Sequence, residues 1–297
     1  MLGARSGSSF PAMFVRGAGR SFALVRGACL ALLTLGLAAC TTTPRRAVTL
    51  TFAGLVGDRP FACAGTYDGI GTTGTTLTAL DFRFYVHDLA LVTADGRAVP
   101  IALDTDPVWQ TGGVALLDFE AGTGCEEGNA PTRTIVTGTI PDDGTVFTGL
   151  RFHVGIPASL NHLDADTQPS PLNLTSLFWG WSGGYKFFRV DGRSTGQPGG
   201  FRFHLGSTGC TGDPRNGSAA CANENVPEIT LAGFDAAHDV VVADLAGLFE
   251  GSDLDHDQGV APGCMSDVED PDCLPLFDAI GLGTATQTTF RVAHGGI

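Results

Sequence analysis

Three of the seven histidines lie in contexts where an imidazole could bind a metal ion. His87 ends a strand-like alternation, His162 lies in Leu160-Asn-His-Leu-Asp164, and His204 precedes Leu205-Gly-Ser-Thr-Gly-Cys210. Imidazole binds copper well, and a site needs two or three such groups brought together by the fold. Spacing alone does not show that the three meet, and a single histidine is more often a hydrogen-bonded structural residue. Both interpretations therefore stay open for each of them.

Three further histidines are assigned no role. His153 alternates with Arg151 opposite apolar neighbours, which indicates a solvated face of its strand. His238 and His294 lie in polar or terminal segments, where a surface position is the simpler interpretation.

The seventh histidine, His256, belongs to the acidic loop Asp253-Leu-Asp-His-Asp-Gln-Gly259. Carboxylates at alternate positions are arranged as oxygen ligands are around calcium. The glycine, however, falls one place late for an EF-hand, and Cys264 stands where the bidentate glutamate should be. A solvated acidic loop is favoured over calcium binding, which stays a weak alternative.

The three tryptophans differ in how well packing explains them. Trp179 and Trp181 share the parity of Leu177, so a common packed face accounts for both. Trp109 follows a proline and a valine in a polar approach to the predicted strand 113–119, and packing explains it less well.

Familiar catalytic patterns are missing from the sequence. It contains no G-x-S-x-G elbow, no H-E-x-x-H helix and no phosphate-binding Gly-Lys loop. Paired carboxylates such as Asp118 and Glu120 are too common to indicate acid/base catalysis without geometry. The protein is therefore not expected to be an enzyme.

Besides Cys40, which is discussed below, six cysteines lie beyond the first forty residues. They are Cys63, Cys125, Cys210, Cys221, Cys264 and Cys273. An even number in an oxidising compartment predicts disulfides, and the two close pairs, 210 with 221 and 264 with 273, are the economical choice. That choice leaves Cys63 for Cys125. Thiolate metal ligation is the rival interpretation, but no pair has the C-x-x-C spacing typical of such sites.

The first forty residues predict a lipoprotein signal peptide. Four arginines and no acidic residue precede an apolar run from Cys29, and Leu37-Ala-Ala-Cys40 offers the small residues and the cysteine that processing needs. Cleavage would leave Cys40 as the acylated N-terminus, followed by a tether over residues 41–47. We expect a lipid-anchored protein on the periplasmic side, at the outer membrane of a Gram-negative bacterium.

The chain beyond residue 40 is strongly acidic. It keeps 13 of the 17 basic residues and all 31 acidic ones, a net charge near −18. Such a charge makes nucleic acid an improbable partner and suits cations or a basic protein.

The elements that must position these residues are mostly strands. Val48, Leu50 and Phe52 alternate with polar residues, and so do the apolar residues between Leu80 and Val86, with a change of phase near Asp88 that suggests a bulge. Further strands are predicted at 113–119, 134–139, 150–156, 184–190, 201–205, 230–231 and 240–242. Only residues 244–249 and 273–280 resemble helical turns. Residues 48–297 are therefore predicted to form one all-β domain, an antiparallel β-sandwich or barrel.

The stretch Pro157–Leu177 is too long for a simple hairpin connection and is expected to be functional.

Several segments, in this order, resemble the MbnP-like family, the four-cysteine member of the "metallo-mystery pair". The resemblance covers roughly residues 48–283. It is carried by Phe82-Arg-Phe-Tyr-Val-His-Asp88, Trp109-Gln110 with Val114-Ala-Leu-Leu-Asp-Phe-Glu120, Leu160-Asn-His-Leu-Asp164, Phe178-Trp-Gly-Trp-Ser-Gly-Gly-Tyr-Lys186, His204-Leu-Gly-Ser-Thr-Gly-Cys210 and Gly263-Cys-Met-Ser266. Six cysteines rather than four is a departure from the family pattern, and it leaves open which pairs belong to that pattern.

The resemblance implies a periplasmic or surface copper-binding protein encoded beside a di-haem, MauG-like peroxidase, MbnH. That partner oxidises a tryptophan to kynurenine, whose aniline nitrogen can join histidines at copper. Similar copper proteins of methanotrophs are MopE and CorA. Carried over to this chain, the resemblance suggests His87, His162 and His204 as ligands and Trp109 as the oxidised residue, with Trp179 as runner-up.

The function predicted from the sequence is thus non-enzymatic copper binding by histidines and a modified tryptophan. A cell-surface adhesion or assembly module, in which the histidines only pack, is the alternative from another class. A hydrolase with an unfamiliar site ranks last, because only scattered carboxylates favour it.

Overall fold

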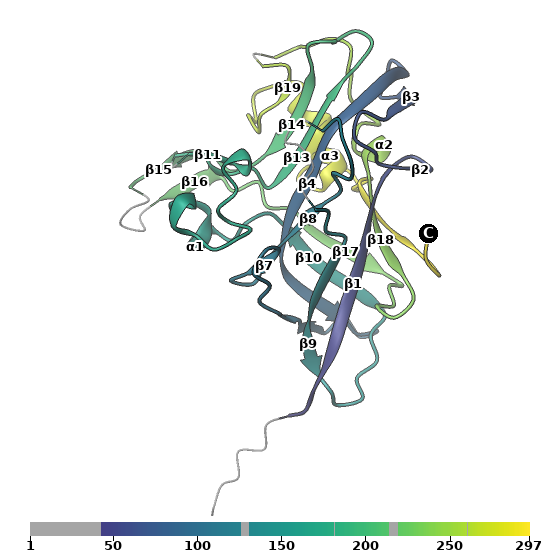
Figure 1. The fold of residues 1–297 in the computed structure, drawn as a ribbon, viewed down its shortest axis with the longest axis vertical. Coiled ribbons are helices and arrows are strands. Elements are labelled where there is room, and N and C mark those ends of the chain that lie inside the picture. The colour runs from purple at the N-terminus through teal and green to yellow at the C-terminus, as the bar shows by residue number, and fades with distance from the viewer. Residues whose placement is uncertain (1–42, 126–130, 181, 214–218, 260) are drawn as a thin grey trace, which may run out of the picture. The chain divides into compact units, whose positions relative to one another are not determined.

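The strand β4 (Thr75–Val92) lies at the centre of the fold and pairs with strands on both of its edges. The computed structural model describes residues 43–297 except 126–130, 181, 214–218 and 260 (Figure 1). Residues 43–297 cluster as one compact unit. The predicted signal peptide, 1–40, and the lipidation site at Cys40 lie outside the described residues.

Two sheets make up the domain. The smaller has the strand order β20-β18-β1-β9-β6, with β2 beside β1. Its strands are β1 (Arg45–Val56), β2 (Arg59–Pro60), β6 (Ala102–Leu103), β9 (Ile135–Pro141), β18 (Val240–Asp244) and β20 (Phe290–Ala293).

The larger sheet has ten strands in the order β17-β10-β4-β13-β14-β19, with β3, β5 and β8 on β4 and β7 on β8. Besides β4, its strands are β3 (Thr66–Ile70), β5 (Ala98–Pro100), β7 (Gln110–Thr111), β8 (Val114–Asp118), β10 (Gly149–Val154), β13 (Phe188–Arg193), β14 (Phe201–Leu205), β17 (Glu228–Ala232) and β19 (Gly263–Cys264). The pairings are antiparallel except for β1 with β18 and β14 with β19.

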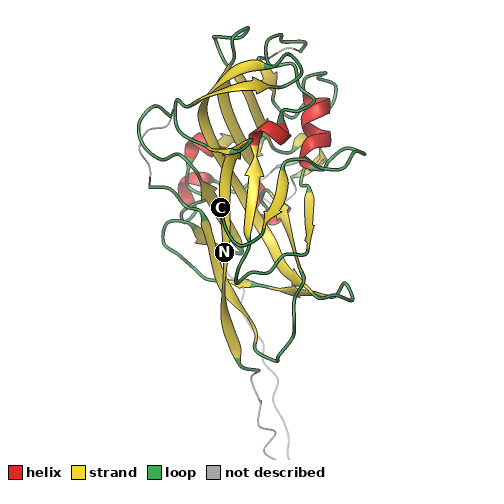
Figure 2. Ribbon diagram, turned by 90° about the vertical axis from the view of Figure 1, so that its right-hand side faces the viewer, coloured by secondary structure: helices red, strands yellow, loops and turns green. Residues whose placement is uncertain are grey.

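The hydrophobic core lies between the two sheets. Phe52 of β1 makes edge-to-face ring contacts with Phe84 of β4 and Phe152 of β10, and Phe84 stacks on Phe188 of β13 with ring centroids 5.0 Å apart. Phe290 of β20 closes the same cluster from the smaller sheet. The predicted all-β sandwich is therefore confirmed, and Figure 2 shows how little helix accompanies the strands.

The predicted bulge lies where the alternation of β4 changes phase. His87 pairs with His153 and Ala90 with Arg151, so two residues of β4, Asp88 and Leu89, face one residue of β10. Asp88 has a φ of 50°, in the left-handed region. The bulge lets Leu89 be buried on the core side although it shares the sequence parity of His87.

Short helices and two small sheets complete the domain. The helices are α1 (Ala158–Asn161), η1 (Ala165–Thr167), η2 (Thr175–Leu177), α2 (Leu245–Leu248) and α3 (Cys273–Ile280). The small sheets pair β11 (Phe178–Gly180) with β12 (Gly184–Tyr185), and β15 (Thr208–Thr211) with β16 (Ala220–Asn223). In Figure 1, α1, β11, β15 and β16 gather on one side of the sheets. In the part of the chain that the structure describes, no helix is long and apolar enough to cross a membrane.

Three disulfides connect the cysteines in the pairs that the sequence made most economical. They join Cys63 to Cys125, Cys210 to Cys221 and Cys264 to Cys273. The boundary of the tether is different from the prediction of residues 41–47, because β1 already begins at Arg45. Arg45 and Arg46 pair with Pro141 and Ile140 of β9.

Candidate metal centre

Two histidines from neighbouring strands stack beside the bulge. His87 of β4 and His153 of β10 are direct cross-strand partners, with ring centroids 5.2 Å apart and ring planes 15° from parallel. The His87 side chain is 6 % exposed and that of His153 is 27 % exposed. One ligand atom from each histidine and one from the carboxylate of Asp88 lie within 4.8 Å of one another.

The ring nitrogens of this pair are poorly satisfied. Nδ1 of His87 lies 3.2 Å from a carboxylate oxygen of Asp88, but among the described residues neither of its ring nitrogens makes a geometrically sound hydrogen bond. Nδ1 of His153 is also buried and has no hydrogen-bond partner among the described residues, and its Nε2 is 3.5 Å from a carboxylate oxygen of Glu228. Burial lowers the pKa of His87, against the opposing charge of Asp88. The neutral imidazole thus favoured is the form that binds metal ions.

Both histidines open onto a cavity of about 490 Å³ that a third histidine, His162, also lines. The wall also includes Asn161 of α1, Cys221 of β16 and Glu224, which follows β16. The segment that begins at Pro157 was expected to be functional rather than a simple connection. Its first residues, from Pro157 to His162, contribute to the wall of this cavity.

His162 is held in place by the residue before it. Asn161 accepts a hydrogen bond from the backbone N–H of Tyr185 and donates one from Nδ2 to Oγ of Ser207. His162 itself is buried, and its Nε2 lies 3.2 Å from Sγ of Cys221. One ligand atom each from His162, Cys210 and Cys221 lie within 4.8 Å of one another.

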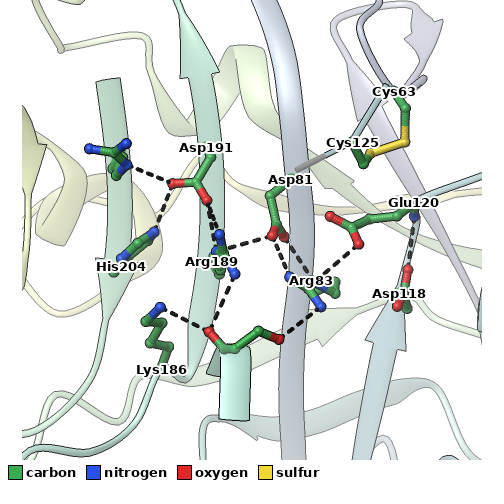
Figure 3. Close-up of polar contacts among 12 residues, drawn as sticks. Cys63, Asp81, Arg83, Asp118, Glu120, Cys125, Lys186, Arg189, Asp191 and His204 are labelled. Carbon is green, nitrogen blue, oxygen red and sulfur yellow. Dashed lines mark hydrogen bonds and ion pairs between the residues drawn. A yellow bond between two sulfur atoms is a disulfide. The ribbon is translucent and has the colours of Figure 1, made fainter. Parts of the chain in front are cut away.

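His204 is placed elsewhere, in a buried network of charges on the larger sheet (Figure 3). Its Nε2 is 2.8 Å from a carboxylate oxygen of Asp191, and it does not line the histidine cavity. Burial lowers the pKa of His204, while Asp191 opposes that shift. The structure thus brings His87 and His162 to one cavity and leaves His204 out, because β14 is separated from β10 by β13 and β4.

The network around His204 balances carboxylates against arginines. Asp81 lies between Arg83 and Arg189, and Arg189 also pairs with Asp191. Although burial disfavours its charge, the hydrogen bond and charge of His204 and the charge of Arg189 lower the pKa of Asp191 to about 2. The loop that contains Pro171 and Ser176 accepts hydrogen bonds from this region. The hydroxyl of Tyr85 donates to the backbone carbonyl of Pro171. Ser176 accepts from Arg83 at its hydroxyl and from Lys186 and Arg189 at its backbone carbonyl.

Glu120 is the exception within this network. It is fully buried, and within the described ranges neither carboxylate oxygen has a hydrogen-bond partner, although Nε of Arg83 is 3.4 Å away. Burial and the charge of Asp81 raise its pKa to about 9. Burial also raises the pKa of Asp118, to about 6.

Comparison with known proteins places the chain in a family. The family model described as MbnP matches residues 45–266. The chain belongs to the MbnP family. Among solved structures, MbnP from Methylosinus trichosporium is similar, with a TM-score of 0.74 and 29 % sequence identity over 84 % of this chain and 99 % of that one. No curated protein matches the sequence significantly.

The two tryptophans suggested by the resemblance to MbnP lie outside the wall of the histidine cavity. Trp109 is half-buried against the core just before β7, where its backbone N–H donates to Asp106. Trp179 lies in β11 and packs against Gly206, and it lines a separate hollow that shares Ser207 with the histidine cavity. Trp181 lies outside the described residues.

The carboxylates of Asp253 and Asp255, in the acidic loop considered for calcium, accept hydrogen bonds from other groups of the protein. Asp255 accepts hydrogen bonds from Thr73, Thr75 and the backbone N–H of Gly196, and Asp253 accepts from the backbone of residues 255 and 256. Across the ranges that the structure covers, no three-residue ligand cluster forms in this loop. Nothing in the loop or in the family match therefore supports a calcium site in this MbnP-family chain.

His153 is the cavity residue that the sequence did not single out. Its alternation placed it correctly on the polar face of its strand, but that pattern does not say which strand lies beside it. His153 lies beside His87 only because β10 pairs with β4 in antiparallel fashion and because the bulge sets the register of that pairing. The change of phase at Asp88 is the signal that, combined with that pairing, could have found it.

Proposed function

We propose that the chain is a copper-binding protein whose metal is held by His87 and His153, with His162 facing the same cavity. The observation that carries this proposal is the stacked pair of imidazoles, one buried and one half-buried, with unsatisfied ring nitrogens beside a cavity. A buried polar atom without a partner costs about 1–3 kcal/mol, so a fold that keeps several together gains from a ligand that satisfies them.

The donor set fits copper. Imidazole nitrogens suit copper and zinc, and copper(II) stands at the top of the affinity order for such ligands. Asp88 lies 3.2 Å from Nδ1 of His87, close enough to orient the ring or to balance the charge of a cation. Bound copper would supply a redox-active cation, and the role proposed for the chain is to hold it rather than to catalyse a reaction.

We also propose that one tryptophan is oxidised to kynurenine by a di-haem peroxidase of the MauG or MbnH kind. Trp109 is the residue suggested by the resemblance. Trp179 is supported by its position in a hollow that shares Ser207 with the histidine cavity. The modification adds one oxygen and removes one carbon. Peptide mass mapping of protein from its native host tests it, and two unmodified tryptophans would contradict it.

Attachment to the outer membrane through a lipid on Cys40, facing the periplasm, belongs to the same proposal. The signal-like pattern of residues 1–40 supports it. Labelling with a radioactive or alkyne-bearing fatty acid in the host, with Cys40→Ser as the control, tests the anchor.

Copper titration of single variants tests the site. We expect His87→Ala and His153→Ala each to weaken copper binding more than about tenfold, since each removes a ligand. His238→Ala is the matched control, because His238 is exposed and remote from the cavity wall. Stoichiometric binding that survives the loss of both His87 and His153 would exclude this site, and a wild type that binds no copper would favour the adhesion-module alternative.

A further inference from the structure

The second ligand cluster of the cavity contains a disulfide. Cys210 and Cys221 are direct partners in the antiparallel pair β15–β16, and their bond closes the hairpin. Nε2 of His162 approaches Sγ of Cys221 to 3.2 Å. A disulfide is a poor metal ligand, but the same two sulfur atoms as thiolates are among the strongest ligands for soft cations.

This disulfide differs from the other two in its surroundings. Both of its cysteines are half-buried, and Cys221 lines the histidine cavity. Cys264 and Cys273 are fully buried in the core. The remaining bond joins the buried Cys125 to the half-buried Cys63, which packs against the core. A reductant in solution can therefore reach the Cys210–Cys221 bond more readily than the Cys264–Cys273 bond.

We propose that reduction of the Cys210–Cys221 disulfide creates a second metal site, formed by two thiolates and His162, that takes copper(I). Soft sulfur ligands select copper(I), whereas the imidazole pair across the cavity also suits copper(II). The protein thereby gains a redox-controlled site next to the imidazole site. The thiolate site uses none of the ligands of the imidazole pair, so the two can be tested separately.

The chemistry balances with a dithiol as the reductant. Its two thiols give two electrons and two protons to the sulfur–sulfur bond through a mixed disulfide, and the reductant leaves as a disulfide. Cys210 and Cys221 are then thiols. Copper(I) displaces their protons to solvent, and a ring nitrogen of His162 supplies the third ligand.

The hairpin has other contacts that can keep the sulfur atoms together once their bond is broken. Backbone pairing continues on both sides of the cysteines, from Thr208 with Asn223 to Thr211 with Ala220. Asn223 donates to Oγ1 of Thr208, and Asn225 donates to the backbone carbonyl of Gly206 at the base of the hairpin. Breaking one covalent bond therefore leaves the ligands close to their positions around His162.

The first experiment identifies the bond that is reduced. The folded protein is treated with dithiothreitol, alkylated with iodoacetamide and mapped by mass spectrometry. We expect alkylation of Cys210 and Cys221 at reductant concentrations that leave Cys264 and Cys273 paired. Simultaneous reduction of all three bonds, or earlier reduction of another pair, would overturn the proposal.

The second experiment measures the site. Reduced protein, freed of dithiothreitol without air, is titrated with copper(I) against a coloured copper(I) chelator, and thiolate-to-copper absorption is followed in the ultraviolet. We expect that absorption in the wild type and in the double variant His87→Ala/His153→Ala. It should disappear in Cys210→Ser/Cys221→Ser, and His162→Ala should weaken binding more than about tenfold.

The variants separate this proposal from the imidazole site. Retention of the ultraviolet band in the histidine double variant supports the thiolate site even if the imidazole pair proves not to bind copper. Unchanged copper(I) binding by His162→Ala, which keeps all cysteines, would overturn the three-ligand site even if the serine variant fails to fold. Absence of the band from reduced wild type would overturn it entirely.

Discussion

Two polar clusters occupy the same face of the larger sheet and have opposite characters. Around Asp81 and Arg189, charges meet charges at hydrogen-bond distance, beneath the segment that contains Ser176. A few residues along β4, His87 and His153 face each other with ring nitrogens unsatisfied and open to a cavity. Burial of polar groups is thus no guide to function by itself. What distinguishes the second cluster is that its unpartnered nitrogens face a cavity, whereas the unpartnered carboxylate of Glu120 in the first cluster does not.

The histidines illustrate the difference most directly. His87 and His204 have nearly the same small exposure, and burial lowers the pKa of both. Nε2 of His204 is hydrogen-bonded to Asp191. The carboxylate near His87, that of Asp88, is not aligned for a hydrogen bond. We therefore expect structural consequences from changes in the ionic network and binding consequences from changes in the cavity.

The largest expected effect comes from breaking the ionic network. Asp81→Ala removes the buried carboxylate that pairs with both Arg83 and Arg189, so that Arg189 keeps Asp191 and Arg83 keeps only the more distant carboxylate of Glu120. We expect the free energy of unfolding to fall by about 3–5 kcal/mol, measured by chemical denaturation. His87→Ala should change it by less than about 1 kcal/mol, because it removes unsatisfied nitrogens. Equal losses from both variants would remove the distinction between the clusters.

The next effect is the stabilisation of the folded protein by copper bound at the histidine cavity. Copper at roughly one hundred times its dissociation constant should stabilise the wild type by about 2.7 kcal/mol, because it binds only the folded state. Thermal unfolding with and without copper measures this. At the same copper concentration the gain should fall by more than about 1.3 kcal/mol in His87→Ala and stay unchanged in His238→Ala. An undiminished gain in His87→Ala would move the copper site elsewhere.

The smallest effect, when it is expressed per pH unit, is a pH dependence inside the network. Burial raises the pKa of Glu120 to about 9 from its ordinary 4.5, so the folded state prefers the protonated carboxyl. Its contribution is fully present below pH 4.5 and is lost as the pH rises toward 9, by at most about 1.4 kcal/mol per pH unit. Denaturation of wild type and Glu120→Gln between these limits tests this. The variant should show a flatter profile, and parallel profiles would mean that Glu120 ionises normally.

Much of the fold could be predicted from local patterns. Alternation in β4 identified the phenylalanines that face the core, and its change of phase identified the bulge. The short spacing of two cysteine pairs indicated their disulfides. These features depend on neighbouring residues in the sequence, where pleating and loop closure act directly.

The candidate site could be predicted only in part, because it depends on which strands lie side by side. His87 and His162 were identified from their contexts. His204 was grouped with them, since nothing in its own segment shows that Asp191, thirteen residues earlier, is its partner on the next strand. His153 was left out for the converse reason, because its partner His87 precedes it by more than sixty residues.

The bulge at Asp88 changes which residues of β4 face the core, so that the odd-numbered residues before it and after it lie on opposite faces of the strand. A regular strand that kept the same number of residues would put Leu89 and Leu91 on the face of His87, away from the interior. The bulge therefore keeps these two leucines buried whether or not an ion is ever bound. A lineage that stopped using the metal could lose the histidines by substitution and would still keep the irregular strand.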